Sequence, residues 1–223
     1  MHWQPVARRD LVEKQPLETD SLHVWWWPDR LQPTATTRRQ RTDAILRTLL
    51  ARYLPIDADS LLFGREPKGR PFLQHGWALD FNLSDTGGGT VLAVAWHARV
   101  GIDIERSDRT PPVARLAARW FATDEADALQ QMEPECARRA FLHLWTAKEA
   151  ACKATGTGIF GYLSTWRFGV DAAAASPQLH GLPAAAGDTA RWRFHRLTPA
   201  PFHTVALACR DNMATPVGFE VIE

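Results

Sequence analysis

The chain has 223 residues, of which 45% are hydrophobic, with 26 basic and 25 acidic side chains and a formal net charge of +1. This length and apolar content allow one or two domains with a substantial core, and the charge balance excludes an overall attraction to nucleic acid or membrane. No apolar run approaches roughly 18 residues and the first five residues lack a signal-peptide pattern, so we expect a soluble, cytoplasmic protein. The three cysteines are widely spaced and form no metal-site pattern, so we expect reduced and mostly buried thiols.

The first element expected is a strand at residues 22–28, after a polar and irregular segment at residues 1–20. Its three consecutive tryptophans at positions 25–27 have two readings. One is a stacking platform for nucleic-acid bases. We favour the other, packing in the core and between two parts of the chain, because a strand sends alternate residues inward.

A helix is predicted to open near residues 36–43 and to run to about Tyr53, with leucines and an isoleucine facing inward. The arginines at its start, Arg38, Arg39 and Arg41, oppose the helix macrodipole. That penalty is easier to understand if an anion binds there. A solvated basic turn is the alternative.

Residues 63–72 form a turn-rich loop that contains Arg70, and residues 81–89 lead into a strand at residues 90–96. Ser84 stands shortly before three consecutive glycines. Such a segment can present a hydroxyl and backbone N–H groups to a phosphate. By itself, a triple glycine indicates only a loop.

Residues 100–105 alternate β-branched and other positions, which is the period of a half-buried strand. Asp103 and Glu105 therefore project from the same face. Two neighbouring carboxylates are tolerated on a solvated edge strand, or where a cation lies between them. This stretch alone leaves both readings open.

The remaining elements complete a pattern in which strand-helix-strand groups occur twice, with a seam near residues 98–100. We predict helices at residues 113–120, from residue 123, and from about residue 135 to 154, where a glycine-rich turn ends the last one. Strands are expected near residues 165–170, 191–197, 204–209 and 218–222, with a variable loop at residues 171–188.

Glu149 and Lys153 lie four residues apart on the long helix, so they share one face at the margin of an apolar stripe. An ordinary surface pair is one reading. However, only four of the 26 basic residues are lysines, and Lys148 and Lys153 both lie here. Lysine is a compact charge whose pKa can be shifted, so its presence favours proton or phosphate chemistry.

Taken together, these segments resemble the signature of the Sfp-type 4′-phosphopantetheinyl transferases. The central part is Gly101-Ile102-Asp103-Ile104-Glu105, followed about forty residues later by the segment Trp145–Lys153. Gly69-Arg70-Pro71 and Phe81-Asn82-Leu83-Ser84 are similar to the family's G-K-P and F-N-x-S-H motifs, and residues 119–125 resemble its R-F-F-x-x-x-E segment. The similarity runs from about residue 37 to residue 170, with all motifs in order.

The resemblance implies an α+β fold of the two-layer α/β kind. Two similar halves would be related by a pseudo-twofold axis, each a small, mostly antiparallel sheet with packed helices. We expect the first half at residues 1–99, with the clamps for coenzyme A phosphates. The second half, residues 100–223, would carry the metal site and the face for a carrier protein, and the active site would lie in the cleft between them.

The resemblance also implies a reaction, the Mg²⁺-dependent transfer of 4′-phosphopantetheine from coenzyme A to a serine of an apo carrier protein, with release of 3′,5′-ADP. Carried over residue by residue, it assigns the metal to Asp103, Glu105 and Glu149. It assigns catalysis to Glu149 and Lys153. It assigns the binding of coenzyme A to Arg41, Arg70, Ser84 and Lys148.

Asp85 departs from the family pattern, which has a histidine at this position. An ionised aspartate cannot donate a hydrogen bond to an anion. We therefore expect Asp85 to shape its loop through an Asx turn and to make no direct contact with the nucleotide phosphates.

Two other functions are compatible with the same residues. Another Mg²⁺-dependent phosphotransferase or a phosphatase would use the same carboxylates. A nucleic-acid-binding module would use the ten tryptophans and the arginine clusters, and would bind with a strong salt dependence. We favour the transferase, a monomer acting on an acyl, polyketide or peptidyl carrier protein, with no nucleic acid and no membrane as partner.

Overall fold

The computed structural model describes residues 1–15, 18, 20–31, 37–74 and 76–223. Its helices are α1 (Arg38–Ala51), α2 (Val113–Trp120), α3 (Thr123–Gln130) and α4 (Pro134–Thr155). Its strands are β1 (Trp3–Ala7), β2 (Leu22–Pro28), β3 (Phe63–Arg65), β4 (Pro71–Leu73), β5 (Leu79–Thr86), β6 (Gly89–Trp96), β7 (Arg99–Arg106), β8 (Arg167–Phe168), β9 (Leu179–Gly181), β10 (Trp192–Leu197), β11 (His203–Arg210) and β12 (Val217–Ile222). Thr36, near which the first helix was expected to open, lies outside the described residues.

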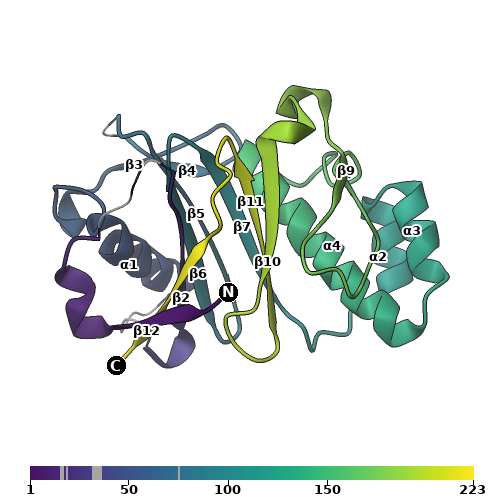
Figure 1. The fold of residues 1–223 in the computed structure, drawn as a ribbon, viewed down its shortest axis with the longest axis horizontal. Helices are drawn as coiled ribbons and strands as arrows, with labels where there is room; N and C mark the ends of the chain where they lie inside the picture. The colour runs from purple at the N-terminus through teal and green to yellow at the C-terminus, as the bar shows by residue number, and fades with distance from the viewer. Residues whose placement is uncertain (16–17, 19, 32–36, 75) are drawn as a thin grey trace.

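The two principal sheets and two of the helices form four layers. A five-stranded sheet in the order β1-β12-β2-β6-β5 faces a three-stranded sheet in the order β10-β11-β7. Helix α1 covers the outer face of the first sheet and α4 covers the outer face of the second, on opposite sides of the strands (Figure 1). Each half is therefore a helix packed on a small sheet, and the two sheets meet face to face.

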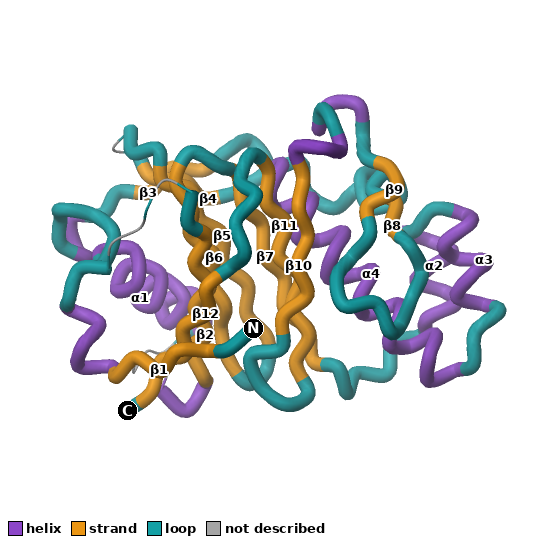
Figure 2. Tube along the Cα trace, in the orientation of Figure 1, coloured by secondary structure: helices purple, strands orange, loops and turns teal. Residues whose placement is uncertain are grey.

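The two halves repeat one order of connections. In the first, β2, α1, β5 and β6 give a sheet in which β6 lies between β2 and β5, and in the second, β7, α4, β10 and β11 place β11 between β7 and β10. All four of these pairings are antiparallel. The expected α+β class, with small antiparallel sheets and packed helices, is confirmed, and Figure 2 shows the strands gathered between the helices.

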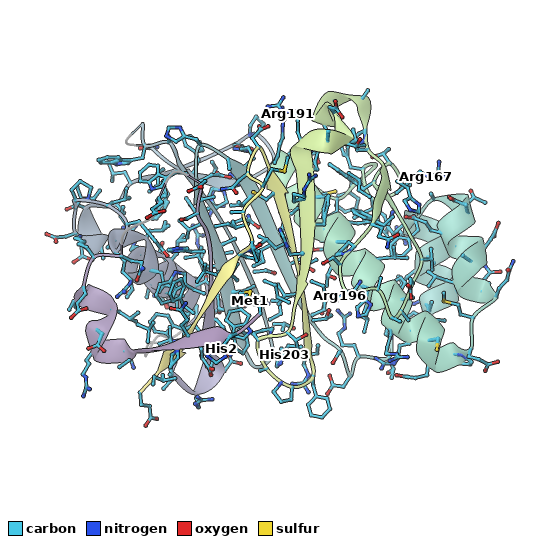
Figure 3. The ribbon with its side chains drawn as sticks, viewed as in Figure 1. Met1, His2, Arg167, Arg191, Arg196 and His203 are labelled. Carbon is cyan, nitrogen blue, oxygen red and sulfur yellow. The ribbon has the colours of Figure 1, made fainter. Side chains whose placement is uncertain are left out.

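The consecutive tryptophans are core residues, as predicted. Trp25 and Trp27 face α1 and are buried in the core between this helix and the first sheet. Trp26 points the other way, into the core between the two sheets, where it joins Val91 and Ile102. Side chains fill the space between the layers in Figure 3.

The beginning of the chain differs from the expectation. Residues 1–20 were predicted to be irregular, but β1 and a 3-10 turn at Arg8–Val12 lie there, because β1 finds a partner far away in the chain. That partner is β12, which lies between β1 and β2 and runs parallel to both. The division into residues 1–99 and 100–223 stays a prediction, but β12 belongs to the sheet of the first half.

The packing of α4 on β7 depends on a glycine. A Cβ atom at Gly101 would lie 2.0 Å from the carbonyl oxygen of Ala150, so a larger residue would push the helix away. The helix begins with Pro134 and ends at Thr155, and the next residue, Gly156, has a left-handed φ of 71°. Close contact at Gly101 brings the last turns of α4 against the middle of β7. None of the helices in the described part of the chain has the length and apolar character needed to span a membrane.

Candidate active site

The two halves are joined along β5 and β7, which belong to different sheets and therefore lack a shared backbone ladder. Side chains from one face of β5 replace that ladder. The Asp80 carboxylate accepts a hydrogen bond from the Val100 N–H at 2.8 Å, and the Asn82 side-chain oxygen accepts one from the Ile102 N–H at 2.8 Å. The asparagine of the F-N-x-S segment thus fixes β7, and with it the carboxylates of that strand.

A cleft of about 670 Å³ opens above this junction. Its first-half wall comes from the start of α1 and the end of β5, and its second-half wall from β7 and α4. Six of the eight residues to which the resemblance assigns a site role line it, namely Arg41, Ser84, Asp103, Glu105, Glu149 and Lys153. Residues separated by more than a hundred positions in the chain therefore share one solvent-accessible space.

Lys153 lines this cleft and bonds to residues of both walls. Its ammonium donates hydrogen bonds to Asp103 Oδ1 at 2.6 Å, to Ser84 Oγ at 2.9 Å and to the Ile102 carbonyl at 3.2 Å. The Ser84 hydroxyl in turn donates to Asp103 Oδ1 at 3.0 Å. Ser84 thus lies in a strand and not in the glycine-rich loop expected from the sequence, and it connects the first half to the charged groups of the second.

The three carboxylates of the cleft differ in their surroundings. Asp103 is 4% exposed, and its Oδ2 has no hydrogen-bond partner among the described residues. Glu105 accepts a hydrogen bond from the Arg109 guanidinium. Burial, reinforced by the charge of Asp103 and opposed by Lys153, raises the pKa of Glu149 to about 7.

These residues fit a divalent cation by their chemistry. Three carboxylates line one cleft, and the unpartnered Oδ2 of Asp103 is an oxygen ligand that nothing else in the described chain uses. Mg²⁺ prefers oxygen ligands of this kind. Within the described residues, no three acidic, histidine or cysteine side chains are already arranged around one metal position. Lys153 and Arg109 currently occupy carboxylate oxygens that a metal would share.

The first-half wall contributes arginine side chains. Arg41 lines the cleft, as does Arg38, whose guanidinium donates to the Asp85 carboxylate and, at 3.0 Å, to the Asp85 carbonyl. Asp85 lies in β5. The bonds to its carboxylate come from Arg38 in the described structure, and not from the backbone N–H that the expected Asx turn requires. A neighbouring arginine, and not a turn, balances the charge of this aspartate.

Arg70 does not line the cleft, contrary to the expectation of a phosphate contact. Its side chain is 3% exposed and its guanidinium forms a two-pronged contact with Asp80, at 3.0 and 2.7 Å. It also donates to the carbonyls of Lys153 at 2.7 Å and Val100 at 2.9 Å. With its donors engaged inside the protein, Arg70 has none directed at a ligand.

Lys148 also lies outside the cleft and is no longer a candidate for coenzyme A binding. It is fully buried, with its ammonium 2.7 Å from the Glu125 carboxylate, and it donates to the carbonyls of Leu163 and Trp166. Glu125, the glutamate of the segment that resembles R-F-F-x-x-x-E, thus belongs to a buried ion pair. A signal for this placement exists in the sequence, because Lys148 stands at helical spacing from Phe141 within the apolar stripe.

The sequence reasoning missed the residues that join the halves. Asp80 and Asn82 carry the junction, and Asp80 was not singled out at all. Strand periodicity offers a partial signal, because residues 80, 82 and 84 must share one face of β5. The pattern does not reveal that this face meets β7.

A cleft with acidic groups and a lysine on one wall and arginine on the other is typical of enzymes that act on phosphate-containing substrates. Comparison with known proteins specifies the class. The family model described as the 4′-phosphopantetheinyl transferase superfamily matches residues 99–208. The 4′-phosphopantetheinyl transferase HetI of Nostoc sp. is 32% identical over 170 residues, which cover 64% of this chain and 72% of HetI.

Two further relatives match over a smaller share of their length. The 4′-phosphopantetheinyl transferase psf-1 of Bacillus pumilus is 34% identical over 56% of this chain and 52% of its own, and Sfp of Bacillus subtilis is 28% identical over 52% and 51%. The chain thus spans about half the length of these two. A holo-[acyl-carrier-protein] synthase of Thermotoga maritima has a TM-score of 0.37 and 24% identity, covering 52% of this chain and 64% of that chain.

The similarity to HetI extends over most of both chains, and the family model matches the second half. The chain therefore belongs to the 4′-phosphopantetheinyl transferase superfamily, a family of transferases.

Proposed function

We propose that this protein transfers 4′-phosphopantetheine from coenzyme A to a serine hydroxyl of an apo acyl, polyketide or peptidyl carrier protein and releases 3′,5′-ADP. The observation that carries the proposal is the composition of the cleft. Arg41 and Ser84 come from one half, and Asp103, Glu149 and Lys153 come from the other. Such a reaction needs positioning and charge neutralisation more than covalent chemistry, and these residue types supply both.

On the first-half wall, Arg41 binds the 3′-phosphate of coenzyme A. The side chain lies near the start of α1, and Arg38, which precedes it on the same helix, is already paired with Asp85. Charge-assisted bonds from a guanidinium to a phosphate are among the stronger polar contacts in proteins. Asp85 makes no direct contact with the phosphates, because it accepts hydrogen bonds and is neutralised by Arg38.

On the second-half wall, Lys153 binds the pyrophosphate and stabilises the leaving group. Its ammonium now donates to Ser84 and Asp103. Because Ser84 also donates to Asp103, this carboxylate keeps a partner when the ammonium moves to a phosphate oxygen. Glu149 accepts the proton of the incoming serine, directly or through one water. Its position beside Lys153, with 4.0 Å between the charged atoms, places base and phosphate-binding group together.

Asp103, Glu105 and Glu149 hold a Mg²⁺ ion in this proposal. The support is the oxygen-only donor set and the unpartnered Oδ2 of Asp103. When bound, the ion supplies charge neutralisation at the pyrophosphate. Glu105 would then exchange its bond to Arg109 for the ion.

The test is a transfer assay read by intact mass. Apo acyl, polyketide and peptidyl carrier proteins are incubated with the protein, coenzyme A and Mg²⁺, and at least one should gain a phosphopantetheinyl group. Serine-to-alanine carriers and a chelator serve as controls, and neither reaction should show the gain. Release of 3′,5′-ADP without any carrier would instead indicate that water cleaves the pyrophosphate bond of coenzyme A, which is the activity of a phosphohydrolase. If every carrier in the panel stayed unmodified, the proposal would be contradicted.

A further inference from the structure

A partly buried network of charges holds the C-terminal end of α4. Arg70, in the connection from β3 to β4, donates from Nε to the carbonyl of Lys153 at 2.7 Å. Arg99, at the start of β7, donates from its own Nε to the carbonyl of Ala154 at 3.1 Å. Both carbonyls lie in the last turn of the helix, where backbone oxygens have no partner within the helix. Two guanidinium groups therefore satisfy the end of α4 that is negative in the helix dipole.

Two carboxylates hold these arginines in position. Asp80 forms the two-pronged contact with Arg70 and also accepts from the Val100 N–H. Glu66 forms a similar contact with Arg99, at 2.8 and 3.2 Å. Arg70, Asp80 and Glu66 belong to the first half, whereas the helix end belongs to the second. The position of α4 is thus set from the opposite half of the molecule.

The geometry points to a role in catalysis that acts through Lys153. Arg70 holds the backbone carbonyl of Lys153, while the side chain of the same residue reaches Asp103 and Ser84 in the cleft. Glu149 lies one turn earlier on the same face of the helix. We propose that Arg70, held by Asp80, is a positioning residue that aligns Lys153 and Glu149 for the transfer reaction, and that it makes no contact with coenzyme A. This inference rests on the proposed function.

The guanidinium shape matters to this role. A planar fork can bond Asp80 with two nitrogens and still offer Nε to a carbonyl on the other side, whereas a lysine ammonium is a single point. A phosphate contact, in contrast, is served by either residue. The variant Arg70→Lys therefore separates the two roles, because it keeps the charge and removes the fork.

The experiment compares Arg70→Lys, Asp80→Asn and their double variant with Leu50→Ala. Leu50 is buried against the first sheet, away from α4, and serves as a control for general loss of stability. Each protein is measured for kcat and KM in carrier modification, for the Kd of coenzyme A by titration calorimetry, and for amide hydrogen exchange in residues 150–156.

We expect each single network variant to lower kcat by roughly tenfold or more, with the Kd of coenzyme A changed by no more than about threefold. Exchange in residues 150–156 should be faster in both single variants. The kcat of the double variant should be no lower than that of the more affected single variant, because both changes remove the same contact between Arg70 and Asp80. Leu50→Ala should lower the melting temperature without speeding exchange there.

A wild-type kcat in Arg70→Lys, or a large loss of coenzyme A affinity in Arg70→Lys with Asp80→Asn unaffected, would overturn the inference. The same loss of kcat in Leu50→Ala would reduce Arg70 to a merely structural role. If the wild-type protein modified no carrier, the proposed function would fall by itself. The exchange data would then decide, because unchanged exchange in both network variants excludes that Arg70 and Asp80 hold α4.

Discussion

Replacing Lys148 by methionine should destabilise the protein severely without altering coenzyme A binding. Methionine keeps the length of the apolar stem but leaves the Glu125 carboxylate buried without its cation, 2.7 Å from where the ammonium had been. The carbonyls of Leu163 and Trp166 lose a donor as well. Breaking a buried pair by removing one partner costs about 3–5 kcal/mol, a large share of a typical domain stability of roughly 5–15 kcal/mol.

Urea unfolding followed by tryptophan fluorescence measures this change, with Lys68→Met as the control, since Lys68 is an exposed lysine. The double variant Lys148→Met/Glu125→Gln removes the buried charge. It should be more stable than the sum of the two single changes predicts, with a coupling of roughly 0.5–3 kcal/mol. If Lys148→Met unfolds at the wild-type urea concentration and binds coenzyme A more weakly, the ion pair is not structural and the reasoning is refuted.

Asp103→Ala should abolish transfer while the far-ultraviolet circular dichroism spectrum is unchanged; a wild-type rate at saturating coenzyme A would end the metal assignment. Lys153→Ala should lower kcat far more than the melting temperature, and losses in proportion would indicate a structural role. Arg41→Ala should weaken coenzyme A binding by about one to two orders of magnitude, the equivalent of one charge-assisted contact. Calorimetry with dephospho-coenzyme A should show no such loss of affinity in Arg41→Ala. An equal loss for both ligands would contradict the contact between Arg41 and the 3′-phosphate. Burial lowers the pKa of His23 to about 4, below its ordinary value of 6.5 in the unfolded chain, so the unfolded state binds more protons between these values. The free energy of unfolding should therefore fall as pH drops through that window, and His23→Asn should reduce this fall in urea titrations at about pH 7.5 and 5.

Local periodicity explains which parts of the fold could be predicted. The alternation in residues 100–105 fixes a strand with Asp103 and Glu105 on one face, and the 3.6-residue period fixes α4 with Glu149 and Lys153 on another. These faces meet because Gly101 lets the helix approach β7, a requirement that a lone glycine in a strand can indicate. The geometry of the cleft thus follows from short stretches of sequence.

Long-range partners explain what could not be predicted. Arg70 and Arg41 are both arginines in first-half segments, and nothing local distinguishes the one that Asp80 binds from the one that faces the cleft. The same holds for Lys148, whose neighbour Glu149 lies about 100° away around the helix and so reaches a different environment. A family motif predicts which residue type stands at a position. Whether the side chain faces solvent or the core depends on residues far away in the sequence.

The strand β12 constrains how the chain can fold during its synthesis. Gly218 pairs with Val24 on one side and with Trp3 on the other, and in the described structure β1 pairs only with β12. During translation, the first half therefore lacks an inner strand of its sheet until residues 217–222 have been synthesised. Closing so long a loop is slow, because its entropic cost comes before any pairing gain. The two halves repeat a topology but do not form separable modules, and a gene fusion that divides them would have to carry residues 217–222 with the first.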